Sequence, residues 1–281
     1  MLFLLGAKQN LQTIHTLTVP YTTGAPLTTQ ELKRGYQTLL QETQPSVPRA
    51  QGASPTYVSD LATVTKLYDV FTAHSSLDDT QYDIRLCNSE GRSHEVLKWT
   101  EQVAQQLGEL HTPFSWLFNL AIDSVFYAAS TNATGGSTSN AVGVLWVNPS
   151  ENWAERDMQE FLVHELDHNL LFLHEWRYGL FRNYSRMADP SAYAKSAIRA
   201  NMRPLDKAFH SAIVAVDVLL LRETVIGHGS GHVLHPPTEK LIPKIIDCAE
   251  SIRELDLREN LLTDDARLLL DRCHDQVLAL R

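Results

Sequence analysis

An uninterrupted helical pattern from Ala154 to Tyr178 constrains this chain more than any other feature. Neither Gly nor Pro breaks it, and apolar side chains recur at helical spacing. Within it stands an H-E-x-x-H motif made by His164, Glu165 and His168. A helix turns about 100° per residue, so the two histidines share one face and both imidazoles can reach one ion. Glu165 lies about 100° round, within reach of a metal-bound water or of the side chains behind the ligands. The pattern predicts a metal site, and the alternative is two solvated histidines on a surface helix.

The composition indicates an ordinary globular protein. It is 43% apolar and 20% charged, and its net charge of −9 argues against binding driven by the phosphates of a nucleic acid. The apolar start Met1–Gly6 is too short for a signal peptide and lacks a cationic flank, and no run approaches the roughly 18 apolar residues of a membrane span. Cys87, Cys248 and Cys273 are odd in number and widely spaced, which argues for a reducing compartment. We therefore expect a cytoplasmic protein.

The remaining patterns predict an α+β fold that is mainly α-helical with one small β-sheet. Residues 1–25 read as partly extended because threonines alternate there, and residues 44–54 are the best linker candidate. Helices are expected at 27–41, 57–73, 93–110, 154–178, 191–201, 204–223, 239–257 and 263–280. We expect residues 1–281 to form one catalytic domain, with an N-terminal helical subregion at 1–54, a metal-binding core at about 142–223 and C-terminal helices at 238–281.

A short strand, Val142–Val147, precedes the motif helix and is ended by Asn148 and Pro149. In zincin-like sites the strand before the metal helix is often a sheet edge that lines the substrate cleft. An extended peptide could add to such an edge through main-chain hydrogen bonds. The equally acceptable alternative is an internal strand that holds Trp146 in the core.

Two histidines do not complete a metal site, and His210 is the preferred third ligand. Pro204 is a good first residue for a helix, and His210 then shares one stripe with apolar residues and Asp217. The stripe points a histidine into an inward face, where it is either a ligand or an ordinary core histidine. Asp217, two turns on, could orient an imidazole by accepting its second N–H.

Two alternatives for the third metal ligand remain open. His174 has the spacing of the metzincin signature, but Leu171 stands where that signature needs a Gly to break the helix. Glu175, or better Glu223 from a later helix, would make a gluzincin-like site. The loop Gly227–Pro237 holds a further histidine cluster, which we interpret as a mobile lid rather than as an independent metal site.

Two sequence blocks together resemble the HExxH-motif proteins known as 2-oxoglutarate-dependent peptide β-hydroxylases, which occur with peptide-modification pathways in bacteria. The first is L-V-H-E-x-x-H-N-x-L-F from Leu162 to Phe172, and the second is R-P-L-D-x-x-x-H-x-x-x-V-A from Arg203 to Ala215. With the preceding strand, they cover about residues 142–222, which is under a third of the chain.

The resemblance implies a non-haem Fe(II) centre held by His164, His168 and His210, with 2-oxoglutarate as cosubstrate. It departs from the usual two-histidine, one-carboxylate arrangement. The expected reaction is hydroxylation at carbon, at the β position, of a peptide or an amino-acid-derived substrate, which a carrier or a leader peptide could present. Arg203 would bind the distal carboxylate of 2-oxoglutarate if the helix begins early enough to place it two turns before His210.

The competing hypothesis is that the protein is a zinc metallopeptidase. It uses the same two histidines, with Glu165 as the general base for a zinc-bound water, whereas the hydroxylase reading gives Glu165 no obvious task. Imidazole suits both ions, so the sequence does not choose between iron and zinc. A non-catalytic metal-binding or interaction protein is a third alternative.

Overall fold

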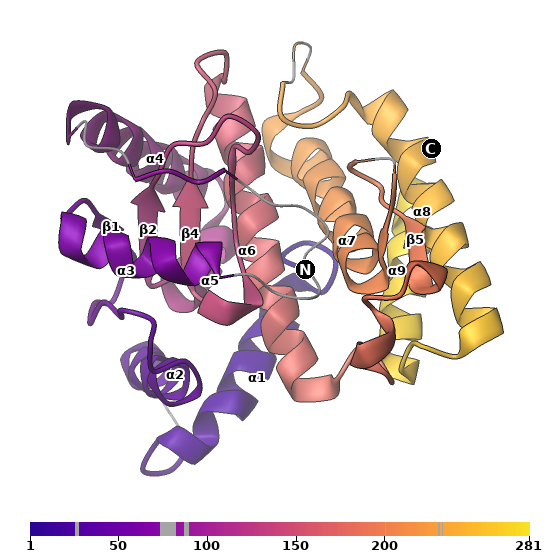
Figure 1. The fold of residues 1–281 in the computed structure, drawn as a ribbon, viewed down its shortest axis with the longest axis horizontal. Helices are drawn as coiled ribbons and strands as arrows, with labels where there is room; N and C mark the ends of the chain where they lie inside the picture. The colour runs from indigo at the N-terminus through magenta and orange to yellow at the C-terminus, as the bar shows by residue number, and fades with distance from the viewer. Residues whose placement is uncertain (26–27, 74–82, 87–89, 200, 230, 232) are drawn as a thin grey trace.

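Helix α6 (Glu155–Tyr178) lies between a small β-sheet and a group of C-terminal helices (Figure 1). The structure is a computed structural model that describes residues 1–281 except 26–27, 74–82, 87–89, 200, 230 and 232. Nearly every side of α6 is covered, because it packs against helices from both halves of the chain. The described residues are mainly helical with little strand, which confirms the predicted α+β class.

The main sheet has four strands in the order β1-β2-β4-β3. Strands β1 (Thr56–Val58), β2 (Ser124–Tyr127) and β4 (Val144–Val147) are parallel, and β3 (Gly135–Gly136) runs antiparallel on the outside. Strand β4 is therefore not an edge strand. Its Trp146 is 1% exposed and donates its indole N–H to a buried carbonyl, so the alternative of an internal strand is the correct one.

A second sheet of two strands corrects two predictions. Strands β5 (Tyr193–Lys195) and β6 (Met202–Pro204) pair antiparallel, so the helix predicted over 191–201 is wrong. The prediction of a single small sheet is also wrong, because this pair forms a second one. A 3-10 turn, η4 (Pro190–Ala192), precedes β5. The hairpin lies against the beginning of helix α7 (Leu205–Leu221), for which Pro204 is the N-cap residue.

Helix α1 (Gly6–Thr18) replaces the extended segment predicted for residues 1–25. Two of its threonines bond their hydroxyl groups within the helix: Thr16 donates to the carbonyl of Gln12 and Thr18 to that of Ile14. The alternation of threonines was therefore a misleading signal for a strand. The helix expected at 27–41 is found as α2 (Thr29–Thr43), which Thr28 begins with a capping box.

The other helices follow the predicted ranges closely, apart from the β1 strand at the start of one of them. They are α3 (Leu61–Thr72), α4 (Glu90–Leu110), α8 (Thr238–Glu259) and α9 (Asp264–Ala279), and five π-helical residues, η5 (Arg222–Ile226), extend α7. Helix α5 (Thr112–Ala121) was not predicted. Short 3-10 turns are η1 (Val19–Tyr21), η2 (Ser139–Ala141) and η3 (Tyr184–Arg186). None of the helices in the described part of the chain combines the length and apolarity needed to cross a membrane.

One large hydrophobic core contains residues from Met1 to Val277, and α6, α7 and the C-terminal helices all contribute buried side chains to it. A smaller core on the other face of the sheet contains Trp146, Phe126 and Leu67. The thiols of Cys248 and Cys273 are buried and free, and Cys87 lies outside the described residues.

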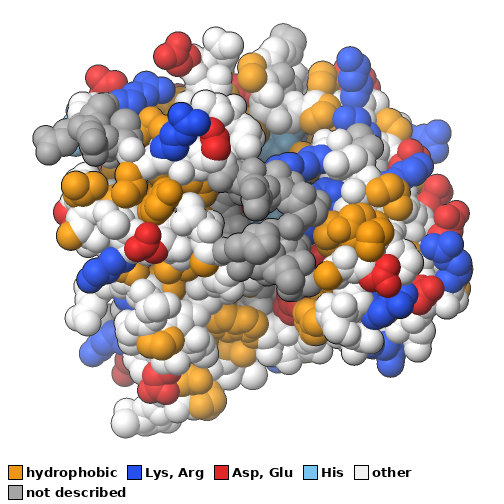
Figure 2. Space-filling view, in the orientation of Figure 1, with side chains coloured by type: hydrophobic (Ala, Val, Ile, Leu, Met, Phe, Trp, Pro, Cys, Tyr) orange, Lys and Arg blue, Asp and Glu red, His pale blue; other side chains and the backbone are white. Residues whose placement is uncertain are grey.

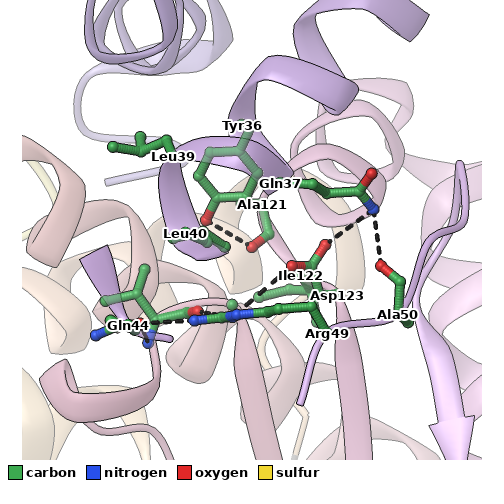
Figure 3. Close-up of polar contacts among 12 residues, drawn as sticks. Tyr36, Gln37, Leu39, Leu40, Gln44, Arg49, Ala50, Ala121, Ile122 and Asp123 are labelled. Atoms are coloured by element: carbon green, nitrogen blue, oxygen red, sulfur yellow. Dashed lines mark hydrogen bonds and ion pairs between the residues drawn. The ribbon is translucent and has the colours of Figure 1, made fainter. Parts of the chain in front are cut away.

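A buried polar network ties the predicted linker, residues 44–54, to α2 and to the start of β2 (Figure 3). The Lys33 ammonium donates to Asp123 at 2.8 Å and to two backbone carbonyls, and Arg49 lies 3.7 Å from the same carboxylate. Gln44 accepts a hydrogen bond from Arg49, while the Tyr36 hydroxyl donates to a nearby carbonyl. The segment is thus a firmly held connection.

The α-amino group of Met1 is buried between α6 and α7, where the N-terminus lies in Figure 1. It forms ion pairs with Asp167 of α6 and Asp217 of α7. The backbone N–H groups of Phe3 and Leu4 also donate to Asp217. Two carboxylates on neighbouring helices therefore anchor the first four residues in the core.

Candidate metal centre

Helix α6 presents His164 and His168 one turn apart, as the motif predicts. Their Nε2 atoms face each other at 3.2 Å, and their rings meet edge to face. Two nitrogen ligands about 2.0–2.1 Å from one ion lie roughly 2.9–3.4 Å apart. The facing pair therefore has the separation of two ligands on one metal ion.

Helix α7 brings His210 next to this pair. Its Nδ1 lies 3.0 Å from Nδ1 of His168, the rings stack, and Phe172 packs against both. His210 is 6% exposed, so the predicted inward direction is correct. The expected role of Asp217 is wrong, because that carboxylate binds the N-terminal segment.

The fourth member of the cluster, His235, was not predicted. Its Nε2 lies 2.9 Å from Nδ1 of His164, and the residue is 2% exposed. On its other side, Nδ1 lies 3.0 Å from a carboxylate oxygen of Glu160, which also forms a two-pronged ion pair with Arg222. His235 thus stands between a metal-motif histidine and a buried carboxylate.

Helix α6 itself fixes the segment that carries His235. One oxygen of Asp157 accepts the backbone N–H groups of Val233 and Leu234, while the other accepts the N–H of Ala154 at the start of the helix. Asp157, Glu160 and His164 lie on neighbouring turns of one face, so they hold the segment and then contact its histidine. The end of the predicted lid is therefore anchored in the structure.

The beginning of the same loop has other partners. His228 contacts Thr238 and Glu223 through its two ring nitrogens. Ser230 and His232 lie outside the described residues. Lid motion of the remaining stretch stays a prediction.

Glu165 is buried beside the facing pair. One of its oxygens accepts a hydrogen bond from Ser137 at 2.7 Å, and the other lies 3.8 Å from Nε2 of His164. Asn169, one turn on, donates to the Ser137 hydroxyl and to the Glu165 carbonyl. The carboxylate is held with one oxygen toward the nitrogen that would bind a metal.

Burial sets the protonation states of the cluster. It lowers the pKa of His164 and His168 far below the usual value and that of His210 to about 3, so all three imidazoles are neutral at neutral pH. Neutral imidazole is the form that binds metal ions. Burial also raises the pKa of Glu165 to about 7, against the opposing hydrogen bond from Ser137.

Two cationic side chains lie near the histidines. After burial and the neighbouring histidines, Lys207 and Arg203 are the next causes that lower the pKa of His168. Arg203 does not reach the site by the predicted helical spacing, because it belongs to β6 and α7 begins only at Leu205. Figure 2 shows histidine side chains in a hollow at the centre of this face, with Lys and Arg side chains beside them.

The alternative third ligands are engaged elsewhere. His174 is buried and contacts Asp265 at 2.6 Å. Glu175 accepts a hydrogen bond from the Tyr184 hydroxyl, and Glu223 contacts His228. The metzincin-like and gluzincin-like sets therefore do not assemble around the facing pair.

The donor chemistry fits a metal ion only in part. His164 and His168 supply two neutral, facing nitrogens, but His210 contacts His168 through the opposite nitrogen. In the part of the chain that the structure describes, no three His, Cys, Asp or Glu side chains are arranged to hold one ion together. A third protein ligand requires the His210 ring to turn toward the facing pair, and its ligation stays a prediction.

Comparison with known proteins does not assign the chain to a family. No family model matches the chain, and no curated protein is significantly similar to it.

Proposed function

We propose that this protein is a non-haem Fe(II)/2-oxoglutarate-dependent hydroxylase built on a zincin-like HExxH helix, with His164, His168 and His210 as the iron ligands. The observation that carries the proposal is the gathering of neutral, buried imidazoles from α6 and α7 close to cationic side chains. Imidazole nitrogens suit Fe(II), and a cation suits the carboxylates of a 2-oxo acid. When bound, iron and 2-oxoglutarate would supply O₂ activation: one oxygen atom of O₂ enters succinate as CO₂ is released, and the other becomes the hydroxyl group on the substrate carbon.

Arg203 is the proposed partner of the distal carboxylate of 2-oxoglutarate. The cation acts electrostatically on His168, and a guanidinium can bind a carboxylate through two parallel hydrogen bonds. Lys207, one turn before His210 on α7, adds positive charge at the same end of the cluster. The pair would favour a dianionic cosubstrate over a neutral one.

The proposed substrate is an extended peptide, or an amino-acid derivative, hydroxylated at the β-carbon. Strand β3 is the outermost described strand of its sheet, and Ser137 directly after it contacts Glu165. A peptide that added to β3 through main-chain hydrogen bonds would pass beside the histidine cluster.

A zinc metallopeptidase is a second candidate, favoured by one specific observation. The free oxygen of Glu165 lies 3.8 Å from Nε2 of His164, where it could take a proton from a metal-bound water. The hydroxylase proposal gives this carboxylate the lesser task of orienting water or substrate.

Anaerobic reconstitution with Fe(II) and 2-oxoglutarate tests the proposal. We expect a visible charge-transfer band that needs both components, and succinate when O₂ is admitted. The His168→Ala variant should show neither. Tight zinc binding with no response to 2-oxoglutarate would contradict the hydroxylase and support the peptidase.

Replacing Glu165 by Gln separates the two enzymes. The peptidase should lose nearly all turnover because it loses its base, while the hydroxylase should retain succinate formation. Glu175→Gln, on the same helix but bound to Tyr184, is the matched control and should change neither activity.

A further inference from the structure

The two nitrogens of His164 have different neighbours, and this difference determines where its proton must lie. Its Nε2 faces His168, while its Nδ1 lies 2.9 Å from Nε2 of His235. A neutral imidazole has one N–H and one lone pair. Only the tautomer with the proton on Nδ1 presents a lone pair from Nε2 to a metal ion.

The groups behind His164 determine that tautomer. Both oxygens of Glu160 accept from Arg222, at 2.7 and 2.9 Å, and the three side chains Glu160, Arg222 and His235 are at most 2% exposed. Burial alone would raise the pKa of Glu160, but hydrogen bonds from His235 and Arg222 lower it to about 2. Glu160 is therefore an ionised carboxylate, which accepts hydrogen bonds and donates none.

The proton positions then follow in order. Because Glu160 only accepts, Nδ1 of His235 must carry the hydrogen of their 3.0 Å contact. The 2.9 Å contact between Nε2 of His235 and Nδ1 of His164 needs one hydrogen, and in the arrangement that we infer His164 donates it and His235 accepts it. This leaves Nε2 of His164 unprotonated and directed at His168.

We propose that His235, held by Glu160 and Arg222, is a positioning residue that fixes His164 in its metal-binding tautomer and orientation. This inference rests on the metal centre of the proposed function. Metal-binding histidines commonly donate their second N–H to a fixed acceptor, and loss of that acceptor weakens metal binding. Here the acceptor is a second imidazole, which a carboxylate and a guanidinium hold in turn.

The geometry does not support a direct ligand role for His235. Its Nε2 contacts the nitrogen of His164 that points away from His168. An ion between the facing Nε2 atoms would bind the nitrogen of His164 that His235 does not contact. The influence of His235 on the metal centre must pass through His164.

Long-range ¹H–¹⁵N correlation spectra of the metal-free, full-length protein test the tautomer directly. We expect His164 to carry its proton on Nδ1 in the wild type and to lose this preference in His235→Leu. His235→Gln, whose amide supplies one donor and one acceptor, should restore it in part. His174→Gln, which changes a buried histidine of α6 with its own carboxylate partner, should leave His164 unchanged. A wild-type His164 protonated on Nε2 would overturn the inference, even if the Leu variant does not fold.

Metal affinity provides the second readout. We expect His235→Leu to bind Co(II) about 10- to 100-fold more weakly than the wild type, with the Gln variant in between and His174→Gln within about twofold. Equal affinity in the wild type and His235→Leu overturns the inference and leaves the proposed function intact. A wild type that binds no Fe(II), Co(II) or Zn(II) refutes the metal centre, while the tautomer measurement still decides the arrangement of His235.

Discussion

The α-amino group of Met1 forms an ion pair with the carboxylate of Asp217, and both are completely buried. Asp217 lies on α7, on the helix that also carries His210, and Asp167 on α6 forms the second ion pair of the ammonium. Both oxygens of Asp217 are occupied, because they also accept the N–H groups of Phe3 and Leu4. The N-terminal residues thereby join the two helices that carry the histidine cluster.

Replacing Asp217 by Asn should destabilise the protein by about 2–3 kcal/mol. All three donors now reach a carboxylate oxygen, and an amide would turn its own NH₂ group toward at least one of them. Urea unfolding followed by circular dichroism measures the loss. Asp275→Asn, at a carboxylate that is 79% exposed, is the control and should change stability by less than about 0.5 kcal/mol. Equal stability of the two variants would show that the buried ion pair contributes nothing.

The stability difference between wild type and Asp217→Asn should shrink as the pH rises above 8. Burial lowers the pKa of the Met1 amine, but Asp167 and Asp217 together raise it above its ordinary value of 8.0. A group whose pKa is raised by folding stabilises the native state fully below its unfolded pKa, and this contribution is lost as the pH rises through the folded pKa. Free energies of unfolding at about pH 7, 9 and 10.5 test this. A difference that stays constant or grows over this range contradicts the prediction.

If the protein is the proposed hydroxylase, replacing Arg203 by Ala should raise the KM for 2-oxoglutarate by about 10- to 100-fold, because the proposed charge-assisted contact to a carboxylate would be lost. Arg203→Lys should recover only part of it, since an ammonium cannot form the two parallel hydrogen bonds of a guanidinium. Succinate formation against cosubstrate concentration measures both. Arg253→Ala, which removes a surface partner of Asp271, is the matched control. An unchanged KM in Arg203→Ala would remove this residue from the cosubstrate site.

Replacing Lys33 by Met should cost about 2–4 kcal/mol of stability. Burial lowers the pKa of the Lys33 ammonium, but three oxygens accept its hydrogen bonds, one of them from Asp123. The variant leaves two carbonyls without this donor and Asp123 with Arg49 as its remaining cation. Chemical denaturation compares it with Lys66→Met, an exposed lysine on α3, which should be near neutral. Adding Asp123→Asn to Lys33→Met should recover part of the loss, because it removes the buried charge.

The motif helix was predictable because its evidence is local. The histidine spacing, the absence of breakers and the strand before it all act within a few residues, and α6 begins one residue after the expected Ala154. The inward direction of His210 followed equally from the stripe that it shares with apolar residues on α7.

His235 could not be predicted because its position depends on distant partners. Its neighbours His164 and Glu160 are separated from it by 71 and 75 residues, and the glycines before it indicated a flexible loop. One signal lay within the helix: Asp157 and Glu160 share a face with His164, and both side chains are buried there. Buried acidic residues need partners, and these two find them in the segment that ends at His235.

Asp217 was misassigned for a related reason. Its helical spacing correctly indicated an inward direction, but direction does not identify a partner. The actual partner comes from residues 1–4, whose pattern gave no sign of a return to the core.

Helix α6 contacts both the N-terminal residues and the segment that ends at His235, so the cluster depends on contacts between distant parts of the chain. Leu2 reaches Asp167 across 165 residues, and His235 reaches His164 across 71. Such distant contacts form slowly, since long loops must close first. A newly made chain therefore carries scattered imidazoles with no preorganised affinity for an ion. In the proposed metal centre, an ion would therefore bind only after the native topology has formed, so that metal uptake would follow folding.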